Sequence, residues 1–398
     1  MAQTLEALLK AGASKRLPSE PVLFNLSLEA DRSEVAALLE QYKIQQVVDD
    51  YTEQLTELYQ IEHPSDVYAP TFATAVAEHV TTLEKEAPLW SRGRWAYFPW
   101  MATIVHILEE APFQKVRTAR NRNLITAEEQ QKFYEAVVGV AGLSVGNSVA
   151  LAIVLQGGAK HIRLADHDAL ALSNTNRVRA GVADLGLPKV EVSARQIYLL
   201  NPYATVELFP EGLNPGNISD FFSGPPKLDI VIDEVDNLAV KYLIREQAKQ
   251  RRLAVVMAAD NGDNAVVDVE RYDQNPDLPF FQGRLGAVTY DELRSLDKFG
   301  IGKMITKHVG PENVTERMQE SLLEMGKTIV SWPQLGGAAL LNGAAVAYAV
   351  RKIITGQPLE DNRALISLDE KLIPTYNSKE EIEKRARVAA TFRNIFGL

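Results

Sequence analysis

Residues 136–147 read AVVGVAGLSVGN, and this stretch decides the fold. Its first half, Ala136–Ala141, is a run of β-branched and small apolar residues, which predicts a buried strand. The second half turns through glycines at 142 and 146 and opens a helical stretch near Asn147–Gln156. A strand that leads through a glycine turn into a helix is a building unit of parallel sheets, and the amides at such a helix start can bind phosphate.

The chain beyond this unit alternates short β-branched runs with helical stretches. Strands are expected at Ile162–Ala165, Thr205–Phe209, Leu228–Ile232 and Ala254–Met257, and helices near Lys189–Leu200, Asn217–Phe222 and Leu238–Arg251. Such alternation is typical of right-handed crossovers between parallel strands, with helices on both faces of the sheet. We therefore predict a doubly wound, Rossmann-like α/β domain with a mostly parallel sheet.

Three parts are expected along the chain. Residues 1–112 are predicted to form a mostly helical N-terminal domain, because apolar residues recur at helical spacing over Ser33–Leu58 and Thr71–Lys85. Residues 113–275 hold the Rossmann-like core, and residues 276–398 extend it with a loop-rich segment and the Ala-rich helix Gly336–Ile354. The small residues of that helix indicate close packing against a neighbour.

Three of the four tryptophans lie close together in the N-terminal part, at positions 90, 95 and 100. An aromatic binding surface and a packed core or domain seam both fit this pattern. We favour packing, because large aromatic side chains dominate the energetics of cores.

Composition narrows the class of protein. Hydrophobic residues make up 46% and charged residues 24%, as in soluble globular proteins, and the net charge of −10 makes nucleic-acid binding unlikely. The chain has no cysteine, which excludes disulfides and cysteine thioesters, and its six histidines show no metal-ligand spacing. We see no apolar run long enough to cross a membrane and expect a cytoplasmic protein without membrane contact.

The glycine turn departs from the regular G-x-G-x-x-G pattern. Ser144 stands where the middle glycine is expected, and Gly146 comes one residue early, so a purely structural turn remains an alternative to a phosphate site at Gly142, Ser144 and Gly146. About twenty residues further on, the next strand ends in Asp166-His167-Asp168. An acidic residue at that place can accept hydrogen bonds from ribose hydroxyls, although Asp166 could also cap its own loop.

Cationic and amide groups follow the acidic residues. Asn174, Arg177 and Lys189 supply the hydrogen-bond donors and positive charges that a triphosphate requires. The strand that ends near Ile232 then delivers the sequence Asp233-Glu234-Val235-Asp236-Asn237 to the same sheet edge. Carboxylates at that edge can hold Mg²⁺ on phosphate oxygens.

The order and spacing of these motifs resemble the ubiquitin-activating-like adenylyltransferases of the ThiF/MoeB type, over roughly Arg117 to Arg271. The resemblance implies an ATP- and Mg²⁺-dependent enzyme that activates a carboxylate as an acyl-adenylate. It assigns Asp166 to the ribose, Asn174, Arg177 and Lys189 to the phosphates, and Asp236 to magnesium and catalysis. Asp168 is expected beside them in the nucleotide site.

The same resemblance implies a homodimer. Arg122 lies before the first core strand, where the family places an arginine that reaches into the partner subunit's ATP site, and Arg117 and Arg120 compete for this role. Because the chain lacks cysteine, it is similar to the simpler members that pass the adenylate to an external nucleophile.

The expected substrate is the C-terminus of a ubiquitin-like or sulfur-carrier protein, a peptide, or a small carboxylic acid. Two alternatives stay open: a non-catalytic nucleotide- or partner-binding protein, and an NAD-dependent oxidoreductase on the same fold.

Overall fold

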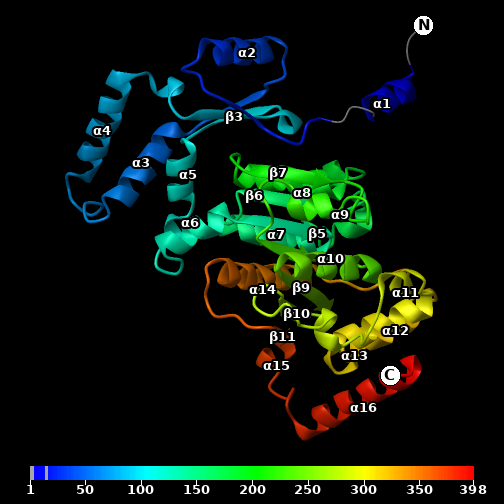
Figure 1. The fold of residues 1–398 in the computed structure, drawn as a ribbon. Coiled ribbons are helices and arrows are strands. Elements are labelled where there is room, and N and C mark those ends of the chain that lie inside the picture. Colours follow the sequence, from blue (N-terminus) through cyan, green and yellow to red (C-terminus); the bar gives the residue numbers. More distant parts are fainter. Residues whose placement is uncertain (1–3, 14–16) are drawn as a thin grey trace. The chain divides into compact units, whose positions relative to one another are not determined.

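The computed structural model describes residues 4–13 and 17–398, which belong to two compact units (Figure 1). The first unit comprises Met1–Leu124 with Asn201–Tyr203, and the second comprises Ile125–Leu200 with Ala204–Leu398. The division falls after Leu124 rather than after residue 112. Helix α5 (Glu110–Arg117) and the 3-10 helix Ala119–Asn121 therefore belong to the first unit.

The first unit is richer in helix than in strand, as predicted, but it also contains a four-stranded sheet that was not expected. Its other helices are α1 (Leu5–Ala13), α2 (Glu29–Glu40), α3 (Tyr51–Glu62) and α4 (Phe72–Glu86). The sheet has the order β1-β3-β4-β2, formed by Val22–Phe24, Arg94–Phe98, Thr103–Ile107 and Gln46–Asp49.

The single helix expected over Ser33–Leu58 is wrong. The chain leaves α2 at Tyr42, whose φ of 55° is left-handed, and β2 then pairs in parallel with β4. The β-branched pair Val47-Val48 fits a strand once a partner strand is present.

The tryptophan-rich segment contributes to the core of this unit. Trp95 and Tyr97 on β3 are buried and pack with Phe24 and Ile104. Trp90 by contrast is 46% exposed. The packing interpretation is thus confirmed for the residues of β3.

The second unit is built on a seven-stranded sheet of order β11-β10-β9-β8-β5-β6-β7. Its five parallel strands are β5 (Val137–Ala141), β6 (His161–Ala165), β7 (Thr205–Phe209), β8 (Ile230–Asp233) and β9 (Ala254–Asn261). Strands β10 (Asn264–Arg271) and β11 (Asn362–Ile366) continue it in antiparallel pairing. The predicted mostly parallel, doubly wound α/β fold is confirmed.

Helices cover both faces of this sheet. On one face, α7 (Val145–Leu155) packs against α8 (Lys189–Leu200) and against α14 (Gly336–Ile354), while α9 (Ile218–Ser223) and α10 (Leu238–Arg251) pack together on the other (Figure 1). Helix α6 (Ala127–Glu135) leads into β5. This layering leaves the carboxyl edge of the parallel strands open for a site.

The expectation that no apolar run is long enough to cross a membrane is wrong for helix α14, which has the length and composition of such a span. In the fold it packs on α7, β9 and β10, so burial in the domain core explains its composition. A Cβ at Gly343 would lie 2.8 Å from the backbone oxygen of Ser148 on α7. The predicted close packing of this helix is confirmed.

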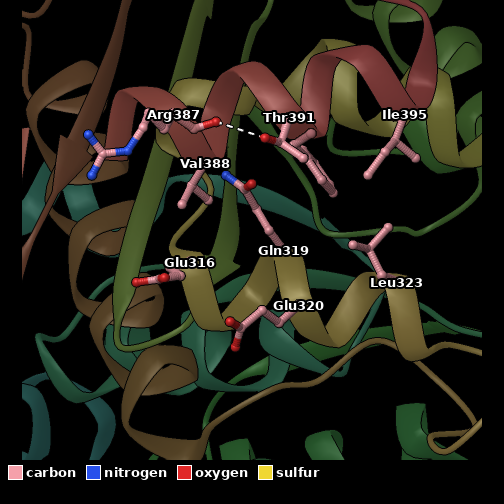
Figure 2. A pocket seen from close by; sticks show the side chains of 9 residues that line it. Glu316, Gln319, Glu320, Leu323, Arg387, Val388, Thr391 and Ile395 are labelled. Carbon is pink, nitrogen blue, oxygen red and sulfur yellow. Dashed lines mark hydrogen bonds between the residues drawn. The ribbon is translucent and has the colours of Figure 1, made fainter. Parts of the chain in front are cut away.

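The segment predicted as loop-rich contains three helices, α11 (Tyr290–Arg294), α12 (Lys298–Val309) and α13 (Glu316–Glu324). Helices α15 (Leu368–Leu372) and α16 (Lys379–Phe396) end the chain. A groove of about 230 Å³ lies between α13 and α16, and Figure 2 shows the side chains that line it. Its charged lining is Glu316, Glu320 and Arg387, which is not the cation cluster that a phosphate group requires.

Candidate functional site

A cavity of about 480 Å³ opens at the carboxyl edge of the parallel strands, where the chain order reverses on the two sides of β5. It is lined by the segments that follow β5, β6, β7 and β8, together with the starts of α8 and α10: Gly142, Leu143, Ser144, Ala165, Asp166, His167, Asp168, Lys189, Gly212, Leu213, Glu234, Val235, Asp236, Asn237 and Val240. Open α/β sheets bind their ligands at this edge. The volume is in the range of small-molecule and cofactor sites.

The glycines of the turn allow close approach between β5, α7 and the end of β8. Gly142 has a φ of +85°, and a Cβ there would lie 2.3 Å from the backbone oxygen of Glu234. A Cβ at Gly146 would lie 3.0 Å from Val140 and 3.5 Å from Glu234. Gly146 therefore stands behind the cavity wall, where it permits close packing of helix and strand rather than contact with a ligand.

Ser144, which stands where the middle glycine of the pattern is expected, makes a hydrogen bond through its side chain. Its Oγ accepts a hydrogen bond from Arg177 Nε at 2.8 Å. Arg177 NH1 also donates to Asn176 Oδ1 at 2.9 Å. The serine that replaces the middle glycine thus anchors a guanidinium group at the turn, although Arg177 itself is not among the residues that line the cavity.

Asp166 is buried and holds the surrounding loops. Its Oδ2 accepts from the backbone N–H of Leu143 at 2.7 Å, and its Oδ1 accepts from that of Asp168 at 2.8 Å. Asp166 therefore caps its own loop, and its role toward a ribose stays a prediction. A carboxylate offers about four acceptor positions, so the capping role leaves room for ribose hydroxyls.

Lys189 is the buried cation of the cavity, with only 6% of its side chain exposed. Its Nζ donates to Asp168 Oδ2 at 2.7 Å and lies 3.9 Å from Asp166 Oδ2. Burial opposes the ionisation of Asp168, but the hydrogen bond and charge of Lys189 outweigh it and lower the pKa of that carboxyl. A phosphate that approached Lys189 would compete with Asp168 for the ammonium group.

Two acidic residues follow β8. Glu234 is buried, its Oε1 accepts from the backbone N–H of Ala258 at 2.9 Å, and burial raises its pKa well above the ordinary value. Asp236 keeps contact with solvent, yet the protein around it removes enough water to raise its pKa as well. Its carboxylate faces the cavity and could serve as an oxygen ligand for a divalent cation.

Some predicted site residues lie elsewhere. Asn174 does not line the cavity, and its Oδ1 accepts a local hydrogen bond from the backbone N–H of Ala171 at 2.9 Å. Arg122 is exposed and follows the 3-10 helix Ala119–Asn121 in the first unit. Its proposed role across a dimer interface stays a prediction.

The sequence analysis missed Gly212-Leu213 after β7 and Val240 in the first turn of α10, which together with Val235 form the apolar part of the wall. For Gly212-Leu213, the position shortly after the predicted strand Thr205–Phe209 was the available signal. Asn237, which the motif included, caps α10 by accepting from the N–H of Ala239 at 2.9 Å.

The fold and cavity together define a Rossmann-type α/β domain with a polar, charged site at its topological switch point. Residues 118–276 match the ThiF family.

Several known proteins are similar to this chain, over different shares of its length. The uncharacterized protein MT1398 of Mycobacterium tuberculosis (strain CDC 1551 / Oshkosh) is 39% identical over 307 residues, which cover 77% of this chain and 42% of that protein. The adenylyltransferase and sulfurtransferase UBA4 of Yarrowia lipolytica (strain CLIB 122 / E 150) is 31% identical over 140 residues, or 35% of this chain and 34% of that protein. The chain thus spans less than half of either relative. The match to a crystal structure of PaaA covers 65% of this chain and 77% of the PaaA chain, with 20% sequence identity and a TM-score of 0.45.

Proposed function

We propose that this chain is an ATP-dependent adenylyltransferase that activates a carboxylate as an acyl-adenylate. One observation carries the proposal: Asp166, Lys189 and Asp236 line one cavity at the carboxyl edge of the sheet, and Arg177 is anchored to Ser144 in its wall. The match of residues 118–276 to the ThiF family and the similarity to the adenylyltransferase and sulfurtransferase UBA4 support it.

The residues divide into nucleotide-binding and charge-stabilising groups. The free acceptor positions of Asp166 suit the ribose hydroxyls, and the apolar wall at Leu213, Val235 and Val240 suits the base. Lys189 and Arg177 supply positive charge for the phosphates. In this arrangement the ribose lies beside Asp166 at the end of β6, the base lies against the apolar wall, and the phosphates lie toward the turn after β5.

The proposed chemistry requires no proton transfer. A carboxylate oxygen of the substrate attacks the α-phosphorus, the bond from that phosphorus to the bridging oxygen breaks, and pyrophosphate leaves with the electron pair. The guanidinium of Arg177 and the ammonium of Lys189 stabilise the negative charge that develops on the phosphate oxygens.

We propose Mg²⁺ as the accompanying ion. The residues fit it, because Asp236 presents a carboxylate to the cavity and Mg²⁺ is commonly held by one or two carboxylates plus phosphate oxygens. When bound, the ion would neutralise phosphate charge. The fixed contribution of this chain is the position of Asp236 at the end of β8.

The substrate we propose is the C-terminus of a small carrier protein or peptide, or a small carboxylic acid. Because this chain has no cysteine, the adenylate would pass to an external nucleophile without an enzyme-bound cysteine thioester. We further propose a homodimer, completed by Arg122 of the partner chain, and a cytoplasmic location.

Competitive calorimetry with ATP–Mg²⁺ and NAD tests the nucleotide, and pyrophosphate–ATP exchange in the presence of the three substrate classes tests the reaction. We expect ATP to bind and NAD to compete poorly. Tight NAD binding without ATP binding would favour the oxidoreductase alternative, and ATP binding without exchange for any class would favour the non-catalytic one.

A further inference from the structure

A buried carboxylate, Asp260, stands one strand beyond the acidic residues of the cavity. It lies near the end of β9, which pairs in parallel with β8, and it is 6% exposed. The ends of both strands therefore reach the same edge of the sheet. Neither the motifs of the sequence nor the lining of the cavity includes Asp260.

Both oxygens of Asp260 accept hydrogen bonds, one from the segment that precedes α14 and one from within α14. Gln334 Nε2 donates to Oδ2 at 3.2 Å, and Asn342 Nδ2 donates to Oδ1. Gln334 is only half-buried, whereas Asn342 is fully buried in α14. Asp260 thus ties the segment before α14 to the sheet edge.

The same segment contacts the loop that carries Arg177. The backbone carbonyl of Gln334 accepts a hydrogen bond from Asn176 Nδ2 at 2.8 Å, and a Cβ at Gly336 would lie 2.4 Å from the backbone oxygen of Asn176. The other end of the Asn176 amide, Oδ1, accepts from Arg177 NH1. A continuous chain of contacts therefore runs from Asp260 through Gln334 and Asn176 to Arg177, and on to Ser144 of the turn.

Burial disfavours the charged form of Asp260 at this position. Burial raises the pKa of Asp260 to about 6, the carboxylate of Asp236 adds to this, and the bonds from Asn342 and Gln334 and the charge of Arg177 oppose it. A carboxylate that the fold disfavours, beside a candidate site, is typical of a group kept for function.

We infer that Asp260 is a positioning residue that holds Arg177 at the phosphate-binding turn through Gln334 and Asn176. The inference rests on the proposed function, because it gives Arg177 a phosphate to bind. It adds a residue from β9 and a contact from α14 to a site whose other parts come from the first four strands of the core.

The test is a double-mutant cycle on nucleotide binding. Calorimetry with a non-hydrolysable ATP analogue plus Mg²⁺ is run on the wild type, Asp260→Ala, Gln334→Ala and the double variant. Each single variant is expected to weaken binding by about tenfold, as for the loss of one hydrogen bond to a charged group. The double variant should be no weaker than either single one, because both changes break the same connection.

Adenosine serves as a second ligand in the same titrations, because it has the base and ribose without phosphates. Its affinity should stay unchanged in all variants, whereas a general loosening of the cavity would reduce it together with that of ATP. Asp263→Asn, on the exposed turn that follows β9, is the matched control and should bind both ligands like the wild type.

The outcomes separate the two claims. If the wild type binds no ATP analogue, the proposed function fails and the inference falls with it. If the wild type binds and the Asp260 and Gln334 variants bind equally well, lose adenosine affinity in parallel, or show additive effects, the positioning role alone is refuted. Gln334→Ala removes a half-buried side chain from a loop, so the comparison of this single variant with the wild type, for ATP analogue and for adenosine, still tests the positioning role if Asp260→Ala folds poorly.

Discussion

Arg177 Nε donates a hydrogen bond to Ser144 Oγ at 2.8 Å, which joins the loop after β6 to the turn after β5. Ser144→Ala removes the acceptor and should weaken ATP binding by about three- to tenfold, since such a hydrogen bond contributes on the order of 1 kcal/mol. Ser144→Thr keeps a hydroxyl and should restore most of the affinity. Isothermal titration of both variants with ATP–Mg²⁺ measures this, and equal affinity for Ala and wild type would contradict it.

Asp166→Ala and Asp236→Ala should separate binding from turnover. Asp166→Ala should weaken ATP affinity and also lower the free energy of unfolding by about 1–3 kcal/mol, because the backbone N–H of Leu143 loses its acceptor. Asp236→Ala should lower pyrophosphate exchange more than affinity. Calorimetry, exchange rates and urea unfolding on the same preparations distinguish the two, and the roles assigned are wrong if both variants change affinity alone.

The pKa of Asp260 predicts a pH-dependent stability difference for Asp260→Asn. The pKa is raised from 3.8 to about 6 in the fold, so the group stabilises the fold at low pH and this contribution is lost as pH rises from about 4 through about 6. Above pH 6 the Asn variant should be more stable than the wild type, by about 3 kcal/mol at most, and near pH 4 the difference should vanish.

Asn342 offers a hydrogen-bond acceptor to the amide that Asp260→Asn introduces. Asn342 Oδ1 has no hydrogen-bond partner within the part of the chain that the structure describes, and an amide at position 260 could donate to it. Thermal unfolding across pH 4–8 makes the measurement. An Asn variant that is less stable than the wild type at every pH contradicts the expectation.

Arg122 should act across a dimer interface. Arg122→Ala and Asp236→Ala homodimers are each expected to be nearly inactive, while mixed dimers should regain one working site, because one site in each pair carries both native residues. Mass spectrometry checks that the subunits have exchanged, and the pyrophosphate–ATP exchange assay measures the activity. Confirmed mixing without recovered activity would assign the role to Arg117 or Arg120, or place the whole site in one chain.

Two glycines of α14 should respond in opposite ways to alanine. A Cβ at Gly343 would meet the Ser148 backbone at 2.8 Å, so Gly343→Ala should lower stability by about 1–3 kcal/mol in spite of its better helix propensity. A Cβ at Gly337 meets no atom of the described chain within 4 Å, so Gly337→Ala should be neutral or stabilise by up to about 1 kcal/mol. Chemical denaturation of both variants checks the pair, and equal effects would show that helix packing does not require Gly343.

Local patterns predicted the core well, because its central strands β5, β8 and β9 are buried on both faces and therefore appear in the sequence as short apolar runs. Strand β7 and helices α8, α10 and α14 lie where they were expected, and β5 begins one residue later than the predicted strand. The prediction of one helix over Ser33–Leu58 was wrong because part of this segment depends on a partner that is distant in sequence. Its apolar spacing fits a helix, and only pairing with β4, distant in sequence, makes Gln46–Asp49 a strand.

The sequence by itself determined the doubly wound core, the glycine turn and the acidic, amide and basic residues that follow its strands, since each depends on neighbours within a few positions. Only the tertiary structure decided which of them meet: Lys189 pairs with Asp168, Arg177 is anchored to Ser144, and Asn174 serves its own turn. It also brought Asp260 and Gln334, 74 positions apart, into contact. The physical reason is that hydrogen bonds and ion pairs act over a few ångströms, and folding sets those distances between segments that no sequence pattern connects.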